Sequence, residues 1–539
     1  NDENANFKPL PFVTSRASTA TTVNKAGLLE TVASGVPRVD YLDNSKGSYL
    51  IEPSSTNLIT QSESFGNSYW TKSGASIQGD ASTAGSELIT VSANRDFSSN
   101  TGFWTLSSAW NISGGKLNVN GSLDTGTGTS CWRSGFLTIG TTYAITFTIS
   151  NYVSGSFALL PSNDGRTYFT GNGTYTQTFM ATSTNFGFNR SLASGGVTNL
   201  SIDNVSLKEI QGFSAPSVDS PLGAFKFVES AVNASHYIFN QLSTTLGQTY
   251  SSKIYVKAEE RSKIGLREVS AINSWATFDL TLGTVIDSFG STPKIVLLEG
   301  GWYEISYSQV VGATTYFGIY ILQDSYVSGT PNFSYQGDGT SGVYIFGAQL
   351  EQKSYATSYI KTSGSQITRL AETANGSGNA STFNDSEGVL MANISALSND
   401  GTNRVITIGD NSSGNAVSIQ QVGSNQIIGY VNVGGVNQCA ITASVPTVFF
   451  NKCLIKYKAN DFSFWVNGFE IGADANGVTF PSGTLNRLNF DVGYASSSPF
   501  YGKTKQIQYY NKTLTDLELQ TLTSYSSFNE MALNFNYTI

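Results

Sequence analysis

Residues 250–257 read Tyr-Ser-Ser-Lys-Ile-Tyr-Val-Lys, residues 302–308 read Trp-Tyr-Glu-Ile-Ser-Tyr-Ser, and these two stretches decide the fold class. In each stretch apolar side chains recur at every second position, which is the period of a β-strand. A strand with one buried and one solvated face is typical of antiparallel sheets. The two stretches therefore predict antiparallel β-sheet rather than helix.

The composition of the whole chain agrees with an all-β fold. Only 13% of the 539 residues are charged, 12% are aromatic and 54 are glycine. Soluble domains carry about 25% charged residues, and disordered chains lack aromatic and β-branched residues. Short strands with Gly- and Asn-rich turns account better for this composition. We expect a chain of about three or four β-modules, with helix below about 10% against the usual ~30–35%.

Charge and hydropathy exclude two classes of partner. The net charge is −8 and no block of Lys and Arg occurs, so no nucleic-acid partner is expected. No apolar run approaches the ~18 residues of a membrane span, so no membrane insertion is expected. The start, Asn1-Asp-Glu-Asn, is polar and carries no visible secretory signal. Because it lacks an initial Met, the N-terminus is expected to be processed or incomplete.

An ordered series of motifs carries a family resemblance. The series is Arg-Ala-Ser-Thr-Ala-Thr at 16–21, Pro-Arg-Val-Asp-Tyr at 37–41, Leu-Ile-Glu-Pro-Ser-Ser-Thr-Asn-Leu at 50–58, and the pair Tyr-Ile-Phe-Gly-Ala-Gln-Leu-Glu at 344–351 and Tyr-Ala-Thr-Ser-Tyr-Ile at 355–360. In this order the motifs resemble bacteriophage tail or head fibre proteins, which are virion appendages with lectin-like β-domains. The resemblance implies adsorption to a surface rather than catalysis.

Residues 1–64 are expected to be an attachment or assembly segment. Prolines interrupt this stretch, and since proline cannot donate to a sheet ladder, we do not expect the stretch to bury a core alone. We expect it to lie along its own second jelly roll or along another virion subunit, with a solvated linker as the alternative. The residues expected to dock are Arg16, Arg38, Tyr41, Glu52 and Asn57.

A repeated tripeptide indicates that one module is inserted into another. Ile-Gln-Gly occurs at 77–79 and again at 210–212. The residues between them, 80–210, end on Leu-Ser-Ile-Asp-Asn-Val-Ser-Leu at 200–207 and resemble a carbohydrate-binding-module jelly roll. Residues 65–79 and 211–373 then form the discontinuous outer jelly roll. Insertion is tolerated where the ends of a module lie close together.

The last module is expected at 387–527, after a flexible linker at 374–386. Its features include an Asn-Gly hairpin at 462–469 and a capping box of Thr515 and Glu518. The order of its strands resembles a concanavalin-A-like, or laminin-G-like, lectin sandwich. Residues 528–539 extend beyond this pattern as a C-terminal tail that adds an edge strand or touches a neighbour.

Aromatic side chains of the inserted module are the candidates for glycan binding. Sugars stack on aromatic rings while polar side chains bind their hydroxyls, and the alternative for each aromatic is a place in the core. The candidates are Trp104, Trp110, Trp132 and Tyr168. No cofactor is required, but the resemblance to carbohydrate-binding modules implies a structural Ca²⁺ at Asp203, because their last strand often supplies an acid to that ion.

No catalytic residue is expected. His236 is the only histidine, it lies in a strand-like stretch, and no nucleophile-elbow motif accompanies it. The closely spaced acids of sandwich glycosidases, Glu-x-Asp-x-x-Glu, are also missing. We expect a non-enzymatic protein, with a surface-polysaccharide depolymerase as one alternative and a purely structural capsid decoration or head-fibre protein as the other.

The expected location is the surface of the virion. Other virion proteins and host-surface glycans are the expected partners. Fibres of this kind are commonly homo-oligomers, and we expect a trimer, although the sequence has no coiled-coil heptads that would support one.

Overall fold

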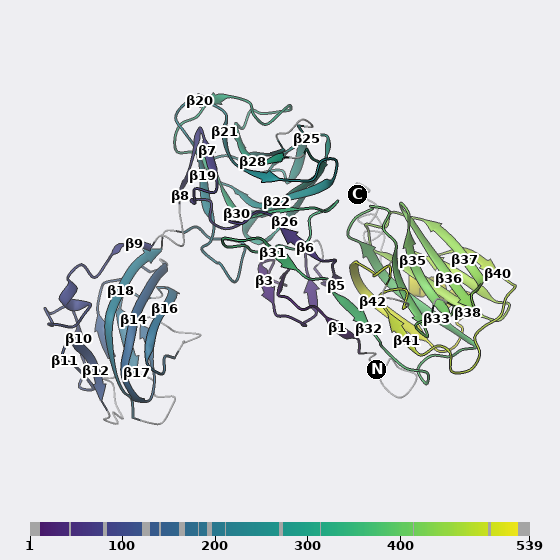
Figure 1. Cartoon of the computed structure of the whole chain (residues 1–539), viewed down its shortest axis with the longest axis horizontal. Helices are drawn as coiled ribbons and strands as arrows, with labels where there is room; N and C mark the ends of the chain where they lie inside the picture. Colours follow the sequence, from purple (N-terminus) through teal and green to yellow (C-terminus); the bar gives the residue numbers. More distant parts are fainter. Residues whose placement is uncertain are drawn as a thin grey trace. The chain divides into compact units, whose positions relative to one another are not determined.

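The fold was described from a computed structural model of the chain (Figure 1). The residues it describes are 11–42, 45–78, 84–120, 130–139, 142–160, 168–181, 183–190, 197–210, 212–268, 273–312, 314–412, 414–493 and 497–525. The predicted all-β fold is confirmed. The helices of the described residues are one α-helix, α1 (Asp516–Thr523), and two 3-10 turns, η1 (Ser92–Asn94) and η2 (Glu299–Gly301). No helix of the described residues is long and apolar enough to cross a membrane.

The chain divides into two compact units. The first comprises Asn1–Ile77, Ala215–Pro221 and Lys226–Ile539, and the second comprises Gln78–Ser214 with Leu222–Phe225. Most of the second unit is thus one continuous stretch whose bounds are close to those of the expected insertion, 80–210. The remaining residues, Leu222–Phe225, join it after a short excursion of the chain into the first unit. The repeated tripeptides include Gly79 and Gln211, which lie outside the described residues.

The second unit is a two-sheet sandwich, drawn in dark blue in Figure 1. One sheet has the order β10-β13-β17-β15, and the other has the order β11-β12-β18-β14-β16 with β9 beside β18. The strands are β9 (Ala84–Glu87), β10 (Thr105–Leu106), β11 (Trp110–Ser113), β12 (Lys116–Asn120), β13 (Ser130–Arg133), β14 (Thr142–Ser154), β15 (Phe157–Leu160), β16 (Gly173–Met180), β17 (Phe186–Arg190) and β18 (Asn199–Ile210). Along β14, Ile145, Phe147 and Ile149 point into the core while Thr146 and Thr148 bond to threonines of β16.

The jelly roll of the first unit is built from two six-stranded sheets. Their orders are β26-β27-β22-β30-β19-β8 and β25-β24-β23-β28-β21-β7. The strands, with the short pair β20 and β29, are β7 (Thr71–Ser73), β8 (Ala75–Gln78), β19 (Phe225–Glu229), β20 (Asn233–Ala234), β21 (His236–Ser243), β22 (Thr249–Ala258), β23 (Lys263–Glu268), β24 (Trp275–Asp279), β25 (Thr284–Phe289), β26 (Ser291–Leu297), β27 (Trp302–Val310), β28 (Thr314–Leu322), β29 (Tyr335–Gln336) and β30 (Gly342–Glu351). The two stretches that indicate the fold class are β22 and β27, which pair antiparallel with each other.

The C-terminal sandwich consists of a seven-stranded and a five-stranded sheet. Their orders are β4-β5-β42-β33-β38-β39-β40 and β37-β36-β35-β34-β41. The strands after the jelly roll are β33 (Glu387–Ala396), β34 (Arg404–Gly409), β35 (Ala416–Val422), β36 (Gln426–Val433), β37 (Val436–Ser444), β38 (Asn451–Lys458), β39 (Phe462–Val466), β40 (Phe469–Asp474), β41 (Arg487–Asn489) and β42 (Gly502–Tyr510). The predicted Asn-Gly hairpin joins β39 to β40, with positive φ at both turn residues. The predicted capping box is present at the start of α1.

The N-terminal segment has one small sheet of its own, β2-β3, and its other strands join strands of later elements. Its strands are β1 (Val13–Ser15), β2 (Ala20–Val23), β3 (Leu29–Val32), β4 (Arg38–Asp40), β5 (Ser48–Ile51) and β6 (Ser55–Asn57). β5 pairs with β42 of the sandwich, β1 pairs with β32 (Thr373–Asn375), and β6 pairs with β31 (Ile367–Arg369). Within the segment, β2 pairs with β3 as a hairpin, and β4 pairs with β5.

Residues 374–386, expected to be a flexible linker, lie against the sandwich instead. Ala374 and Phe383 are buried members of its core. Ser377 and Leu488 exchange two backbone hydrogen bonds, at 3.1 and 2.8 Å. The Gly- and Asn-rich composition of this stretch reflects its turns, because Gly376 and Gly378 both have positive φ.

Excising the second unit is expected to leave the outer jelly roll folded. β22 and β27 pair along their length within the first unit and use no strand of the second. Replacing residues 80–209 with a short Gly/Ser link should therefore keep the β22 amides protected in hydrogen exchange. Rapid exchange throughout β22 in the shortened chain would contradict this, and the full-length chain is the control.

Candidate functional site

The inserted module buries two of its four candidate glycan-binding aromatics. Trp104 is 3% exposed and Trp110 is 4% exposed, and both belong to the core of this unit. The Trp104 ring packs against Phe97, Phe103, Phe186 and Phe188. Neighbouring side chains cover these two tryptophans, so instead of offering a ring face to a sugar they hold the sandwich together.

The other two candidates reach the surface. Trp132 lies half-buried on β13 between Thr105 and Gly187 of the adjoining strands. Tyr168 is 43% exposed and precedes the buried Phe169. Glycan stacking at Trp132 and Tyr168 stays a prediction.

The expected calcium ligand, Asp203, lies at an irregularity of β18. The register of β14 and β18 shifts between Thr146 and Thr148, and Asn204 has a φ of 53° at this point. The Asp203 carboxylate accepts the N–H of Asn204 at 2.7 Å. Within the described residues no group of three or more His, Cys, Asp or Glu could hold a metal. A site of one carboxylate and backbone carbonyls stays a prediction.

His236 is fully buried and cannot reach a substrate from its place in β21. Its Nδ1 faces the Gly74 carbonyl, and its Nε2 lies 3.2 Å from the Tyr335 carbonyl. The ring also packs edge-on against Tyr335, with centroids 4.5 Å apart. These contacts give His236 a structural place in the jelly roll.

Four of the five expected docking residues lie in the interior of their own chain. Arg16, Arg38, Glu52 and Asn57 are at most 3% exposed, and only Tyr41 is half-buried. The Asn57 side-chain nitrogen donates to the carbonyls of Ala348 and Ile360, at 3.1 and 2.8 Å. The segment lies against its own jelly roll, as one of the two expectations has it, and also pairs with β42 of the C-terminal sandwich, which was not expected. These four buried residues are therefore not available to a second virion protein.

The buried charges form one network, which we call the arginine clamp: Arg16, Arg38, Glu52, Arg369 and Glu372. Arg38 donates to Glu52 at 2.8 Å and to both carboxylate oxygens of Glu372, one of them at 2.9 Å. Arg16 pairs with Glu372 at 2.6 Å, and Arg369 lies 3.5 Å from Glu52. The clamp joins the N-terminal segment to the residues that lead from the jelly roll into the sandwich.

The Ser358 side chain and backbone complete the clamp. Its N–H donates to one oxygen of Glu52 at 2.8 Å and its hydroxyl donates to the other at 2.6 Å. Burial by itself raises the pKa of Glu52, but Arg369, Arg38 and these two hydrogen bonds outweigh it and hold the pKa well below its ordinary value of 4.5.

The lowered pKa of Glu52 predicts a loss of stability in acid. A group with a depressed folded-state pKa stabilises the fold above its unfolded value and loses that contribution as the pH falls below it. We expect Glu52 to contribute fully at pH 7 and to lose up to about 1.4 kcal/mol per pH unit below about pH 4.5. Urea unfolding of the parent chain and of Glu52→Gln from pH 7 to pH 3 measures this. The variant should be less stable at pH 7 and fall less steeply in acid, and equal slopes would contradict the assignment.

The outer face of the five-stranded sheet carries a hollow that the sequence did not indicate. Its volume is about 390 Å³. The residues that line it are Asn403, Val405, Thr407, Ser412, Ala416, Ser418, Gln420, Tyr430, Asn432, Val492 and Ser498.

Three neighbouring strands supply the floor of the hollow in register. Val405 of β34 is opposite Gln420 of β35, and Thr407 is opposite Ser418. Ser418 is in turn opposite Tyr430 of β36. The side chains between these positions point the other way, as strand alternation requires. They belong to the core of the sandwich: Ile406, Ile408, Val417, Ile419 and Val431.

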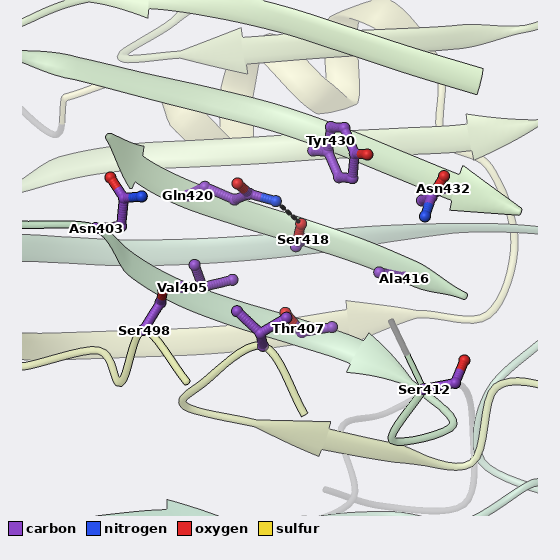
Figure 2. A pocket seen from close by; sticks show the side chains of 11 residues that line it. Asn403, Val405, Thr407, Ser412, Ala416, Ser418, Gln420, Tyr430, Asn432 and Ser498 are labelled. Carbon is purple, nitrogen blue, oxygen red and sulfur yellow. Dashed lines mark hydrogen bonds between the residues drawn. The ribbon is translucent and has the colours of Figure 1, made fainter. Parts of the chain in front are cut away.

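The floor offers hydroxyl and amide groups around one aromatic ring, as Figure 2 shows. The Gln420 amide donates to the Ser418 hydroxyl at 2.8 Å, drawn as a dashed line. Thr407 is 2% exposed, and its hydroxyl has no hydrogen-bond partner among the described residues. Tyr430 is half-buried, so part of its ring remains accessible.

The hollow can bind but has no evident group for acid–base chemistry. Among the described residues that line it there is no Asp, Glu, Lys, Arg, His or Cys. Side-chain amides, hydroxyls and an aromatic ring suit a polar, hydroxylated ligand. The alternation Val417-Ser418-Ile419-Gln420 was a visible sign of a polar outer face, but only the register places Ser418 beside both Thr407 and Tyr430.

Comparisons with known proteins add distant structural likenesses. No protein-family model and no curated protein matches the sequence. The Ruminococcus gnavus IT-sialidase CBM40 has 17% identity and a TM-score of 0.24, covering 28% of this chain and 94% of its own. Domains LG4-5 of the mouse laminin alpha1 chain have 9% identity and a TM-score of 0.19, covering 52% and 86%. The CBM22-1-CBM22-2 tandem domain of Paenibacillus barcinonensis Xyn10C has 10% identity and a TM-score of 0.19, covering 50% and 98%. TM-scores this low establish neither a family nor a ligand for the chain.

Proposed function

We propose that the chain is a non-enzymatic virion fibre or appendage protein of a bacteriophage, whose C-terminal sandwich adsorbs to host-surface glycans. The hollow on β34, β35 and β36 is the observation that supports binding to glycans. The ordered motifs from residue 16 to residue 360 support the virion part, through their resemblance to phage fibre proteins.

A glycan suits the hollow because its lining combines the two contacts that sugars use. Sugar C–H faces pack on aromatic rings, and Tyr430 supplies a ring. Sugar hydroxyls exchange hydrogen bonds with side-chain amides, which Gln420 supplies from the middle strand of the floor and Asn403 and Asn432 supply from its two ends. Binding without cleavage is proposed because the described lining offers no pair of carboxylates for glycoside hydrolysis.

A purely structural fibre is the second candidate, and the arginine clamp is compatible with it. The clamp ties residues 16–52 to Arg369 and Glu372 through buried ion pairs. Such ties stiffen a chain whether or not it binds a ligand. Under this candidate the hollow has no ligand, and other virion proteins are the only partners.

Binding of purified full-length chain to immobilised lipopolysaccharides and capsular polysaccharides tests the proposal. We expect retention on at least one polysaccharide, with no release of reducing ends. Ala416→Arg fills the hollow and should abolish retention, whereas Leu517→Arg, on the exposed face of α1, is the matched control and should retain it. Release of reducing ends would favour the depolymerase, and no retention on any polysaccharide would favour the structural fibre.

A further inference from the structure

We infer that the hollow selects uncharged sugar units, such as hexoses and N-acetylhexosamines, and rejects sugars that carry a carboxylate, sulfate or phosphate. This inference rests on the proposed function, because it names the class of ligand that the same hollow takes. It depends on the uncharged lining of the hollow, on its amides and on its aromatic ring.

The described lining has nothing with which to neutralise an anion. Its eleven residues are all uncharged. Positions 413 and 494–496, which lie outside the described residues, add no Lys, Arg, Asp or Glu to the sequence. Recognition of a carboxylate in a protein site relies on Arg, Lys or several converging N–H groups. An anionic sugar would therefore lose its hydration without gaining a counter-charge.

The charged side chains around the hollow carry both signs, because Arg487 of β41 is opposite Gly409 of β34 and lies on the outer face of the sheet. Asp410 accepts the N–H of the lining residue Ser412 at 2.8 Å, and Asp491 precedes the lining residue Val492. Arg404, although it lies on β34, points to the other face and donates to Asp400 at 2.8 Å. The chain as a whole has a net charge of −8, which repels anionic polymers at low salt. The selectivity therefore rests on the uncharged lining itself.

The Gln420 amide is a polar group that a neutral sugar can bind, because Gln420 lines the hollow and is only partly buried. The Thr407 hydroxyl does not serve in this way, because its oxygen is inaccessible to solvent. Val405, Ala416 and Val492 add apolar lining against which the C–H groups of a sugar ring can pack.

Matched pairs of oligosaccharides test the charge selectivity on the full-length chain. The probes are lactose against 3′-sialyllactose, and methyl-esterified trigalacturonate against the free acid, followed by calorimetry or ligand-observed NMR at 50 and 500 mM NaCl. We expect only the neutral member of a pair to bind, with an affinity that changes less than about twofold between the two salt concentrations.

Three variants locate the binding. Tyr430→Ala should weaken it at least tenfold, because the ring is lost, whereas Tyr430→Phe keeps the ring and should stay within about threefold. Gln420→Ala removes a partly buried amide of the lining and should weaken binding about three- to tenfold. Its melting temperature should stay close to that of the parent chain, which separates a lost ligand contact from a damaged sandwich.

The outcomes distinguish this inference from the proposed function. Equal or tighter binding of the charged probes, or neutral binding that Tyr430→Ala leaves intact, overturns the inference while adsorption to glycans stands. No binding of any probe, together with no retention on the polysaccharides of the previous section, overturns both. Neutral-only binding that depends on Tyr430 and Gln420 supports both.

Discussion

Replacing Arg38 with alanine is expected to lower the free energy of unfolding of the first unit by about 3–5 kcal/mol. Arg38 is fully buried and donates to Glu52, to Glu372, to the Thr21 carbonyl and to the Ser358 hydroxyl. Its loss leaves two buried carboxylates with less counter-charge and two acceptors without their donor. Urea unfolding at pH 7, followed together with hydrogen exchange of β5 and β42, measures the loss.

Two further variants separate the buried charge from a general effect of truncation. Lys361→Ala removes a cation that is 53% exposed although it pairs with Glu63 at 2.6 Å, and it should cost only about 0–1 kcal/mol. Adding Glu372→Gln to Arg38→Ala should recover part of the loss, because one uncompensated carboxylate is removed. If Arg38→Ala costs no more than Lys361→Ala, the arginine clamp does not stabilise the unit.

Replacing Trp104 with alanine is expected to destabilise the second unit by about 3–5 kcal/mol without affecting the hollow. Its ring contacts four phenylalanines, and its indole N–H donates to the Asn94 carbonyl at 2.8 Å. The substitution removes packing and leaves a buried acceptor unpaired. Differential scanning calorimetry of the full chain should show one transition at lower temperature and the other unchanged.

Tyr168→Ala is the matched control in the same unit. The side chain is 43% exposed, so its removal should change stability by no more than about 0.5 kcal/mol. If Trp104→Ala instead leaves the transition unchanged but reduces retention on polysaccharides, Trp104 is a ligand contact and the core assignment is wrong.

The fold class could be predicted from the sequence because strand alternation is a local property. Tyr250 to Lys257 and Trp302 to Ser308 are recognisable one by one, and they form β22 and β27. The hairpin at Asn467 and the capping box at Thr515 are also local, and both are present. These features depend on neighbouring residues alone, which is why the sequence is sufficient for them.

The hollow and the clamp could not be predicted in this way because they depend on register between distant residues. Glu372 meets Arg16 and Arg38 from more than 300 positions away, and no local pattern marks it as their partner. Thr407, Ser418 and Tyr430 become neighbours only when β34, β35 and β36 pair in one particular register. The prediction of a flexible linker at 374–386 was wrong because it depended on composition. Glycines that form turns cannot be told by composition from glycines of a linker.

The pairing of β5 with β42 has a consequence for the order in which the chain folds. Lys503 Nζ donates to the Leu42 carbonyl across 461 positions of sequence. At a synthesis rate of about 5–20 residues per second, the N-terminal strands wait roughly 20–90 s for their partner. During that time β5 has β4 on one side only, and its other edge is open to other chains. The first strands made are therefore among the last to be placed, and a chain that stops before β42 leaves β5 without that partner.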